Sequence, residues 1–402
     1  MKLIFPSMEY PRVGGTENVV VEIARDATRR AVADVVIMGS PDAFVVRRLR
    51  ELSVPFRLVQ DADLAGFRSE PEDLFVHFSN HEWLSRVANL RGRALVWCLL
   101  AHLLTGWNRF NFERQLTGRK RVGTWLNRRL IRNLRNRSAL LAMDGATADA
   151  IELLSGIADT PLLAIPIDAA GIPSVPMRRD VDVMTPFVVT YVGRSDDVWK
   201  IHPARKILRD LENLPFPSAL EIFTDDSRPY EAMFGSRTGS HVQVRYSLGV
   251  LGAELRNNIR ERSALHISMG LSALEGALAG TPTALVDPSY TDLPDHYRYR
   301  WLWETPSFTL GRFLSPDDVG YQGHTLEELI QTARTRESAV AAAQRCIDYV
   351  VRHHAPARIV DALLATKTTL TNRELVQWTP AAHPFARFAG RLIRRAFGNK
   401  PI

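Results

Sequence analysis

The sequence predicts an α/β chain built from two doubly wound parallel sheets, and three observations support this. The chain has 402 residues, more than one hydrophobic core usually holds, so two domains are expected. Apolar strand-like runs alternate with amphipathic helix-like segments, and the alternation occurs twice. Between the two series lies "DAAGIPSVPMRRDVDVMTP", residues 168–186, whose Pro, Gly and charged residues are typical of a linker.

The first series predicts a Rossmann-like domain over residues 1–170. Residues 2–5 are a short apolar strand, and a helix start signal follows at Thr16 or Glu17. The same alternation continues until "PLLAIPI", residues 161–167, closes the series. Further strands are expected at 33–39, 73–79, 94–100 and 138–145, and further helices at 44–52 and 146–154.

After a linker at 171–186, the second series predicts another Rossmann-like domain over residues 187–355. It restarts with the apolar strand "FVVTYVG", residues 187–193. Further strands are expected at 219–224, 242–247, 264–268 and 283–287, and helices at 202–211, 251–261 and 271–280. From about residue 325 the pattern is mostly helical, and residues 356–402 are expected to form C-terminal helices and a basic amphipathic tail.

Several classes of protein are not expected from the composition. Cys98 and Cys346 are the two cysteines, and their wide separation predicts neither a disulfide framework nor a zinc site. The first apolar run ends at Pro6, which is too short for a signal peptide. No run reaches the roughly 18 apolar residues that span a bilayer. We therefore expect a cytoplasmic protein without a structural metal.

Positive charge is concentrated in two segments. Residues 109–137 carry a net +9 and residues 384–402 a net +5, so the rest of the chain is net −7. Such patches favour anionic partners. The tail separates apolar residues from arginines, as an interfacial helix on anionic lipid does. The predicted membrane contacts are Arg128, Arg129, Arg132, Phe388, Arg391, Leu392, Arg394 and Arg395.

For the inner basic segment, a helix packed on the protein is an equally good interpretation. For the tail, an interfacial helix is the favoured one, with a helix packed on the protein as the alternative. Nucleic acid is not expected as a partner, because the chain has no recognition-helix motif, zinc finger or aromatic RNA-binding motif.

Loops that follow strands are the places to seek a ligand site, since ligands bind beyond the carboxyl ends of the strands in such sheets. The first is "YPRVGGTEN", residues 10–18, where Gly14 and Gly15 precede a helix whose amides suit a phosphate. This segment lacks the dinucleotide fingerprint, which argues against an NAD enzyme. A plain glycine turn entering a helix is the alternative.

The second loop is "YVGRSDDVWK", residues 191–200. Arg194 and Lys200 follow a strand and could neutralise a diphosphate. Arg194 would bind it with two N–H groups at once, and Lys200 with its single ammonium charge. Alternatively, both side chains are solvated and pair with Asp196 and Asp197.

The third stretch is "HISMGLSALEGALAG", residues 266–280. Gly270 ends a strand, and Glu275 falls in the first or second turn of the next helix, near its positive end. Its neighbours are small, so a ligand can approach, and a carboxylate can accept hydrogen bonds from the hydroxyls of a ribose. An exposed glutamate on an amphipathic helix is the alternative, but the apolar surroundings weigh against it.

Together, "GGTEN", "YVGR…K" and "SALEGALAGTP" resemble, in this order, the motifs of the retaining GT-B glycosyltransferases of family 4. The resemblance covers roughly residues 1–290. It implies two Rossmann-like domains that face a cleft, with C-terminal helices crossing back. The first domain would bind the acceptor and the second a UDP- or GDP-linked sugar. It also implies transfer with retention, without a metal or another cofactor.

The resemblance also implies roles for individual residues. Gly14 and Gly15 would lie against the donor diphosphate, Arg194 and Lys200 would bind it as it leaves, and Glu275 would hold the ribose, with Gly270 at the start of the same helix. A family histidine near the sugar and acceptor corresponds best to His102, with His81 as the second choice.

One departure from the family pattern matters, since "HISMG", residues 266–270, replaces the usual Glu-Gly-Phe-Gly. The family has a second glutamate, eight residues before the ribose-binding one, that contacts the donor sugar. Here that position is Ile267. His266 or Ser268 are candidates to replace the missing acceptor.

The sequence therefore predicts a membrane-peripheral glycosyltransferase with a lipid-linked or polysaccharide acceptor, in the assembly of cell-surface polysaccharide or lipopolysaccharide. Two alternatives remain open. One is a nucleotide-sugar epimerase on the same fold. The other is a non-catalytic relative that binds nucleotide or glycan, which the missing acid at Ile267 favours.

Overall fold

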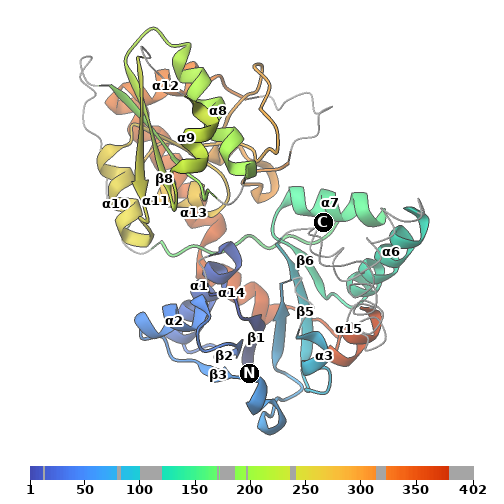
Figure 1. Cartoon of the computed structure of the whole chain (residues 1–402). Helices are drawn as coiled ribbons and strands as arrows, with labels where there is room; N and C mark the ends of the chain where they lie inside the picture. The colour runs from blue at the N-terminus through green and yellow to red at the C-terminus, as the bar shows by residue number, and fades with distance from the viewer. Residues whose placement is uncertain are drawn as a thin grey trace. The chain divides into compact units, whose positions relative to one another are not determined.

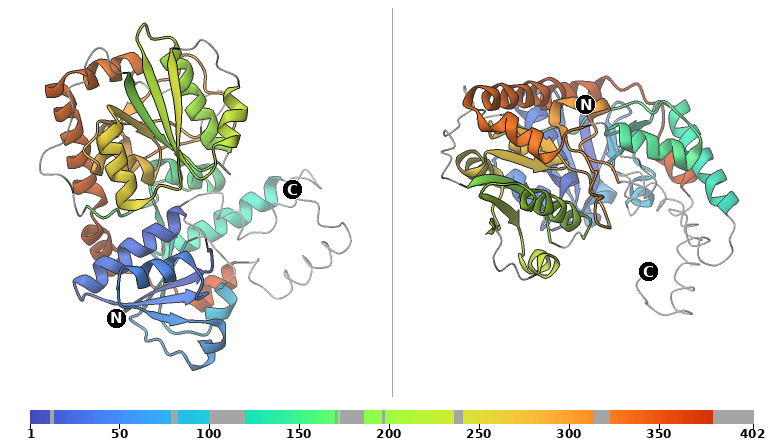
Figure 2. Two further views of the ribbon diagram at one scale, coloured as in Figure 1. Left: turned by 60° about the vertical axis from the view of Figure 1, so that its left-hand side comes forward. Right: turned by 90° about the horizontal axis from the view of Figure 1, so that it is seen from above.

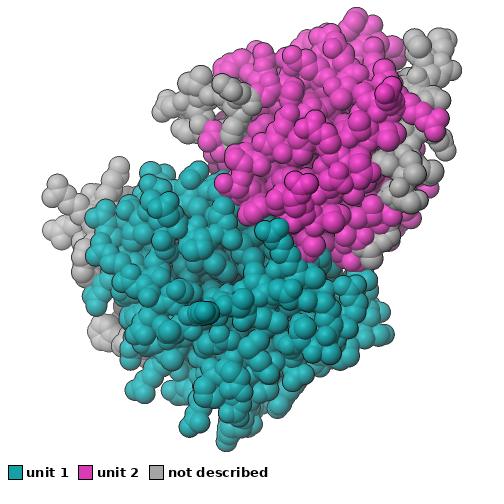
Figure 3. Space-filling model, turned by 180° about the vertical axis from the view of Figure 1, so that it is seen from behind, with its two compact units in different colours: residues 1–166, 356–402 teal, residues 167–355 magenta. Residues whose placement is uncertain are grey.

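The chain folds into two compact units, coloured separately in Figure 3. In this computed structural model the described residues are 1–11, 14–78, 83–99, 120–169, 172, 186–195, 198–235, 241–313 and 323–379, without the side chains of 120–127. The first unit comprises Met1–Pro166 and Pro356–Ile402, and the second comprises Ile167–Ala355. Each unit has its own sheet.

The first unit contains a parallel sheet in the order β3-β2-β1-β4-β5-β6. Its strands are almost continuous apolar runs, as expected when helices cover both faces. The strands are β1 (Lys2–Met8), β2 (Asp34–Gly39), β3 (Arg57–Val59), β4 (Leu74–His77), β5 (Arg93–Cys98) and β6 (Leu140–Ala142). The helices are α1 (Gly15–Arg29), α2 (Phe44–Glu51), α3 (Leu84–Val87), α6 (Lys120–Asn136) and α7 (Gly145–Ser155), with a 3-10 helix at Asp61–Gly66.

Two helices from the end of the chain complete the first unit. Helix α14 (Pro356–Ala365) packs against α1, as Figure 1 shows, and an ion pair of 2.8 Å joins Arg30 to Asp361. Helix α15 (Asn372–Trp378) packs against α3 and β5. At its start, Asn372 Oδ1 lies 3.0 Å from Nε2 of the buried His77 at the end of β4.

The second unit contains a sheet in the order β12-β11-β10-β7-β8-β9, parallel except for the edge pair β11–β12. The strands are β7 (Phe187–Val192), β8 (Ser218–Thr224), β9 (Val242–Leu248), β10 (Leu265–Ser268), β11 (Thr283–Leu285) and β12 (Arg300–Trp301). Counted within its unit, the strand order equals that of the first sheet. The order therefore reverses between β1 and β4 in one unit and between β7 and β10 in the other.

Helices cover both faces of the second sheet. Figure 2 shows α8 and α9, in green, on one side and α10 and α11, in yellow, on the other. The helices are α8 (Val198–Glu212), α9 (Arg228–Phe234), α10 (Gly252–Arg262), α11 (Leu271–Leu278), α12 (Leu326–Arg334) and α13 (Arg336–His354). Two 3-10 helices, Leu302–Glu304 and Pro306–Phe308, lie between β12 and α12.

The prediction of two Rossmann-like parallel sheets is confirmed, with local differences. Helix α1 begins at Gly15, ahead of the expected start at Thr16 or Glu17, because Gly14 is its N-cap. In the stretch at 161–167 the structure has one isolated bridge, between Ala142 and Leu162. The short strands β3 and β12 and the helix α9 were not expected.

The apolar side of α6 packs inside the first unit. Leu130 and Leu134 are buried in a core cluster with residues of β5, β6 and α7. Arg128 Nε donates a hydrogen bond of 2.7 Å to the carbonyl of Ser155. Leu130 and Leu134 therefore pack on the protein, as one of the two interpretations of this basic segment expected. Arg129 and Arg132 are exposed.

The predicted membrane contacts of the tail, Phe388, Arg391, Leu392, Arg394 and Arg395, lie outside the described residues. Across the described ranges, every helix is too short or too polar to cross a bilayer. Contact with a membrane surface thus stays a prediction.

Candidate functional site

The ends of β7 and β10 meet where the strand order of the second sheet reverses. Ser268 Oγ, at the end of β10, donates a hydrogen bond of 3.2 Å to the carbonyl of Val192, at the end of β7. The chain leaves β7 at Gly193, where a Cβ atom would lie only 2.5 Å from the hydroxyl of Tyr230. Glycine is therefore required at this exit. A reversal point of this kind is where doubly wound sheets bind ligands.

Arg194 and Lys200 stand at the carboxyl end of β7, and both are half-buried. The loop that carries Arg194 is fixed because Ser195 donates two hydrogen bonds to Asp225 Oδ1, at 2.8 Å from its amide and 2.9 Å from its hydroxyl. Burial alone would raise the pKa of Asp225, but these hydrogen bonds outweigh it and hold the pKa below its ordinary value. Asp196 and Asp197 lie outside the described residues.

Lys200 lies in the first turn of α8. Its carbonyl accepts a hydrogen bond of 2.7 Å from the hydroxyl of Tyr191, which anchors the start of α8 to β7. Its Nζ lies 4.7 Å from the ring centroid of Trp199, within the range of a cation–π contact.

Helix α11 follows β10 through Gly270, whose φ of +59° suits glycine. The amide of Gly270 donates a hydrogen bond of 2.8 Å to the carbonyl of Leu310. Glu275 falls in the second turn of α11, with its side chain 20% exposed. Its Oε2 accepts a short hydrogen bond from Nε of Arg256 on α10. Sequence reasoning missed Arg256. Its positive charge compensates the carboxylate of Glu275, so the carboxylate is tolerated in this apolar stretch.

Beneath α11, a buried histidine fixes the helix on the sheet. His266 Nε2 lies 3.1 Å from the carbonyl of Ser272, which can only accept, so Nε2 carries the proton. Nδ1 then accepts from Thr190 Oγ1 at 2.9 Å. Burial lowers the pKa of His266 to about 4, so the ring is neutral at pH 7. A Cβ at Gly276 would overlap this ring, which explains the glycine.

The residues around position 267 do not replace the acid that the family has there. Ile267 is fully buried in the apolar core of the second unit. His266 and Ser268 are also fully buried and already hold internal partners. Both therefore have structural roles in joining β10 to β7 and α11.

The loop after β11 is anchored by a buried carboxylate. Asp287 Oδ2 accepts a hydrogen bond from the hydroxyl of Tyr297 at 3.0 Å, and Oδ1 accepts from Arg300 at 3.2 Å and from the amide of Arg312 at 3.0 Å. Burial raises the pKa of Asp287 although Arg300 acts in the opposite direction. This centre ties the segment around residue 312 to the end of β11.

In the first unit, Gly14 and Gly15 stand at the corresponding reversal point after β1. Gly14 is the N-cap of α1, and a Cβ there would clash with the carboxylate of Glu17. Just before this turn, Glu9 accepts a hydrogen bond of 2.7 Å from Nε1 of Trp83. Sequence reasoning missed this pair, because no local pattern connects the end of β1 with the start of α3.

The structure thus brings Arg194, Lys200, Gly270 and Glu275 to the carboxyl edge of one sheet. The two histidine candidates, His81 and His102, lie outside the described residues. Among the residues that are described, no group of three or more His, Cys, Asp or Glu side chains could hold a metal ion.

The sequence matches no protein-family model, and a search of curated proteins gives no match. Solved structures are similar in fold. HepE from Anabaena, in complex with UDP and glucose, has 14% identity and a TM-score of 0.57 over 92% of this chain and 100% of its own. The chain has the GT-B fold.

Two further solved structures are similar over most of the chain. An alpha-glucosyltransferase in complex with UDP and a 13-mer DNA has 11% identity and a TM-score of 0.54, over 91% of this chain and 98% of its own. A variant of TarM from S. aureus, in complex with Fondaparinux, alpha-GlcNAc-glycerol and UDP, has 8% identity and a TM-score of 0.53, over 90% and 99%. The fold prediction is confirmed, and the residue roles stay predictions.

Proposed function

We propose that this chain is a glycosyltransferase that moves a sugar from a UDP-linked donor to a glycan or glycolipid acceptor. The observation that carries the proposal is the position of four predicted donor contacts. Arg194 and Lys200 follow β7, and Gly270 and Glu275 follow β10, the two strands between which the order of the second sheet reverses. The proposal is supported by the fold, because HepE, the alpha-glucosyltransferase and TarM were all solved with UDP.

In this proposal the donor lies across the ends of β7 and β10. Arg194 and Lys200 neutralise the diphosphate as it leaves the sugar, helped by the positive end of α11 beyond Gly270. Glu275 accepts hydrogen bonds from the ribose hydroxyls, and Arg256 orients its carboxylate. Retention at the anomeric carbon and metal-independent transfer follow from the resemblance to family 4.

The acceptor and the membrane complete the proposal. The first unit takes a lipid-linked or polysaccharide acceptor. The basic tail holds the enzyme on the cytoplasmic face of the membrane, where cell-surface polysaccharide or lipopolysaccharide precursors are assembled. His102 is the proposed residue near the transferred sugar.

Calorimetric titration with UDP and GDP tests the donor site. We expect the wild type to bind UDP, and Lys200→Ala and Glu275→Ala each to weaken that binding by at least about tenfold, which is 1.4 kcal/mol. Lys367→Ala and Glu327→Ala are matched controls, because both side chains are exposed and neither is a predicted donor contact. A folded wild type that binds neither nucleotide would contradict the proposal.

The non-catalytic alternative is favoured by one observation, the fully buried Ile267 where the family has an acid. It predicts binding of UDP without turnover. Incubation with UDP-sugars and candidate acceptors, followed by analysis of the products, separates the cases. A transferase yields UDP and a glycosylated acceptor, an epimerase yields a new UDP-sugar without any acceptor, and a binding protein yields neither.

A further inference from the structure

An exposed cluster of aromatic side chains lies at the same edge of the second sheet. Tyr290 is 66% exposed and Phe313 is 44% exposed. Their rings are stacked, with centroids 5.2 Å apart and planes 9° from parallel. Trp199 meets Phe313 edge-on, at 5.6 Å and 68°. We name these three side chains the aromatic platform. Exposed apolar side chains that gather in one patch are typical of ligand sites.

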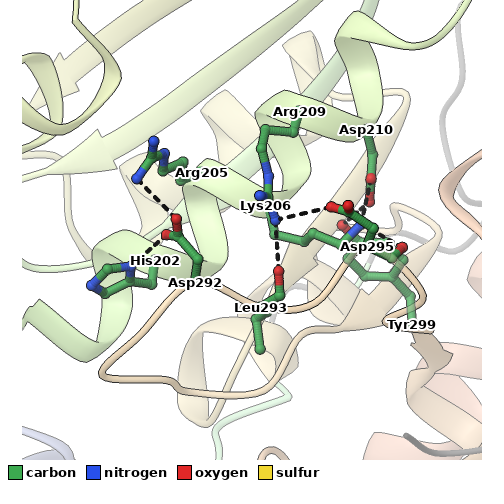
Figure 4. A network of polar contacts seen from close by, with 9 residues as sticks. All are labelled: His202, Arg205, Lys206, Arg209, Asp210, Asp292, Leu293, Asp295 and Tyr299. Carbon is green, nitrogen blue, oxygen red and sulfur yellow. Dashed lines mark hydrogen bonds and ion pairs between the residues drawn. The ribbon is translucent and has the colours of Figure 1, made fainter.

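Helix α8 fixes the Tyr290 side of the platform. The amide of Ser289 donates a hydrogen bond of 3.0 Å to the carbonyl of Trp199. Beyond it, as Figure 4 shows, four basic side chains of α8 hold the segment 292–295. The contacts are His202 and Arg205 to Asp292 at 2.8 and 3.0 Å, Lys206 to the carbonyl of Asp295 at 3.3 Å, and Arg209 to the carbonyl of Leu293 at 2.6 Å.

The buried Asp287 centre fixes the Phe313 side. The amide of Arg312 is bound to Asp287, and Gly311 before it has a φ of +140°. A Cβ at Gly311 would lie 3.1 Å from Pro288, so this approach also depends on glycine. The backbone next to Tyr290 and next to Phe313 is therefore fixed before any ligand arrives, which lowers the conformational entropy lost on binding.

The platform adjoins the groups assigned to the donor diphosphate. Trp199 directly precedes Lys200, whose Nζ lies over the indole ring. On the other side, the carbonyl of Leu310 is bound to the amide of Gly270 at the start of α11. A phosphate near Lys200 would therefore hold its attached group beside the platform.

A donor diphosphate carries a nucleoside at one end and a sugar at the other, and either could lie beside the platform. Glu275 and Arg256 belong to α11 and α10, on one side of the sheet, whereas Trp199 belongs to α8, on the other side (Figure 2). If Glu275 binds the nucleoside on the α11 side, the sugar at the other end of the diphosphate lies on the α8 side. We propose that the aromatic platform binds the transferred sugar, with the carbon-bound hydrogens of a pyranose face against the ring of Tyr290. This rests on the proposed function.

Titration with UDP and with UDP-sugars tests the platform. The probes are UDP-glucose, UDP-galactose and UDP-N-acetylglucosamine. For the UDP-sugar that the wild type binds best, we expect Tyr290→Ala and Phe313→Ala to weaken binding by roughly three- to tenfold, the range of an aromatic stack. Binding of UDP stays unchanged. Tyr290→Phe keeps the ring and retains wild-type affinity, and Leu153→Ala controls for the loss of an exposed apolar side chain.

Magnetisation transfer in proton NMR gives a second readout. When the aromatic protons of the protein are saturated, saturation should pass to the sugar-ring hydrogens of the bound UDP-sugar. In Tyr290→Ala this transfer should disappear. An unchanged affinity for the UDP-sugar in Tyr290→Ala and Phe313→Ala overturns the inference. So does an equal loss for UDP and UDP-sugar, because the rings would then serve the nucleoside or the fold. If the wild type binds no UDP at all, the proposed function itself fails.

Discussion

Replacing Asp144 with Asn should change how the stability of the first unit depends on pH. Asp144 is the N-cap of α7, and its Oδ1 accepts a hydrogen bond of 2.8 Å from the amide of Thr147. The side chain is almost completely buried, and burial raises its pKa from 3.8 to about 6, although the bonds from Thr147 act in the opposite direction. The folded protein therefore holds this proton to a higher pH than the unfolded chain does.

The sign and size of the effect follow from this pKa. A carboxyl group whose pKa is raised by folding stabilises the fold at low pH, and that contribution is lost as the pH rises through about 6. The difference between 3.8 and about 6 corresponds to about 3 kcal/mol. Asn is an equally good N-cap and stays neutral. We therefore expect Asp144→Asn and the wild type to agree within about 1 kcal/mol at pH 4, and the variant to be more stable by up to about 3 kcal/mol at pH 8.

Urea unfolding followed by circular dichroism, at pH values from 4 to 8, measures this difference. Taking the difference between two proteins at each pH cancels the titration of other groups. Leu153→Ala is the control, because Leu153 is exposed on the same helix and carries no charge, so its difference from the wild type should not depend on pH. The reasoning is refuted if the Asp144→Asn difference is also flat. It is likewise refuted if the variant becomes less stable as the pH rises, since the helix dipole would then be stabilising an ionised Asp144.

Two further substitutions probe α11. Gly276→Ala should destabilise the second unit by about 1–3 kcal/mol, because its Cβ would overlap the buried ring of His266. Thermal unfolding measures this, with Gly66→Ala as a control in open space, and equal melting temperatures would argue against the packing. Arg256→Ala should weaken UDP binding by roughly tenfold, because Glu275 loses the partner that orients it. An unchanged dissociation constant in calorimetry would show that the ion pair serves only the fold.

Much of the fold could be predicted because its information is local. A buried parallel strand is a continuous apolar run, and a covering helix repeats its apolar residues every three or four positions. Strands β7 and β10 and helix α11 match their predicted ranges closely for this reason. The two-residue strand β12 is too short to give a pattern, and it pairs only because β11 presents a free edge to it.

The candidate site was predictable only in part. Loops after neighbouring parallel strands must share one edge, so the positions of Lys200 and Glu275 followed from the strand order. Their partners did not follow, because such contacts depend on how the elements pack. Arg256 lies 19 residues before Glu275, and the rings of Tyr290 and Phe313 come from the segments before and after β12.

The first unit is assembled from both ends of the chain, and this has a consequence for its synthesis. Helix α15 supplies Asn372 to His77, and Thr371 pairs with Arg93 at the start of β5. A growing chain cannot make these contacts until it has been synthesised almost to its end. The second unit, by contrast, is one continuous stretch, Ile167–Ala355. During translation the second unit can therefore complete its fold before the first unit does, because β5 lacks its contacts with α15 until that helix has been synthesised.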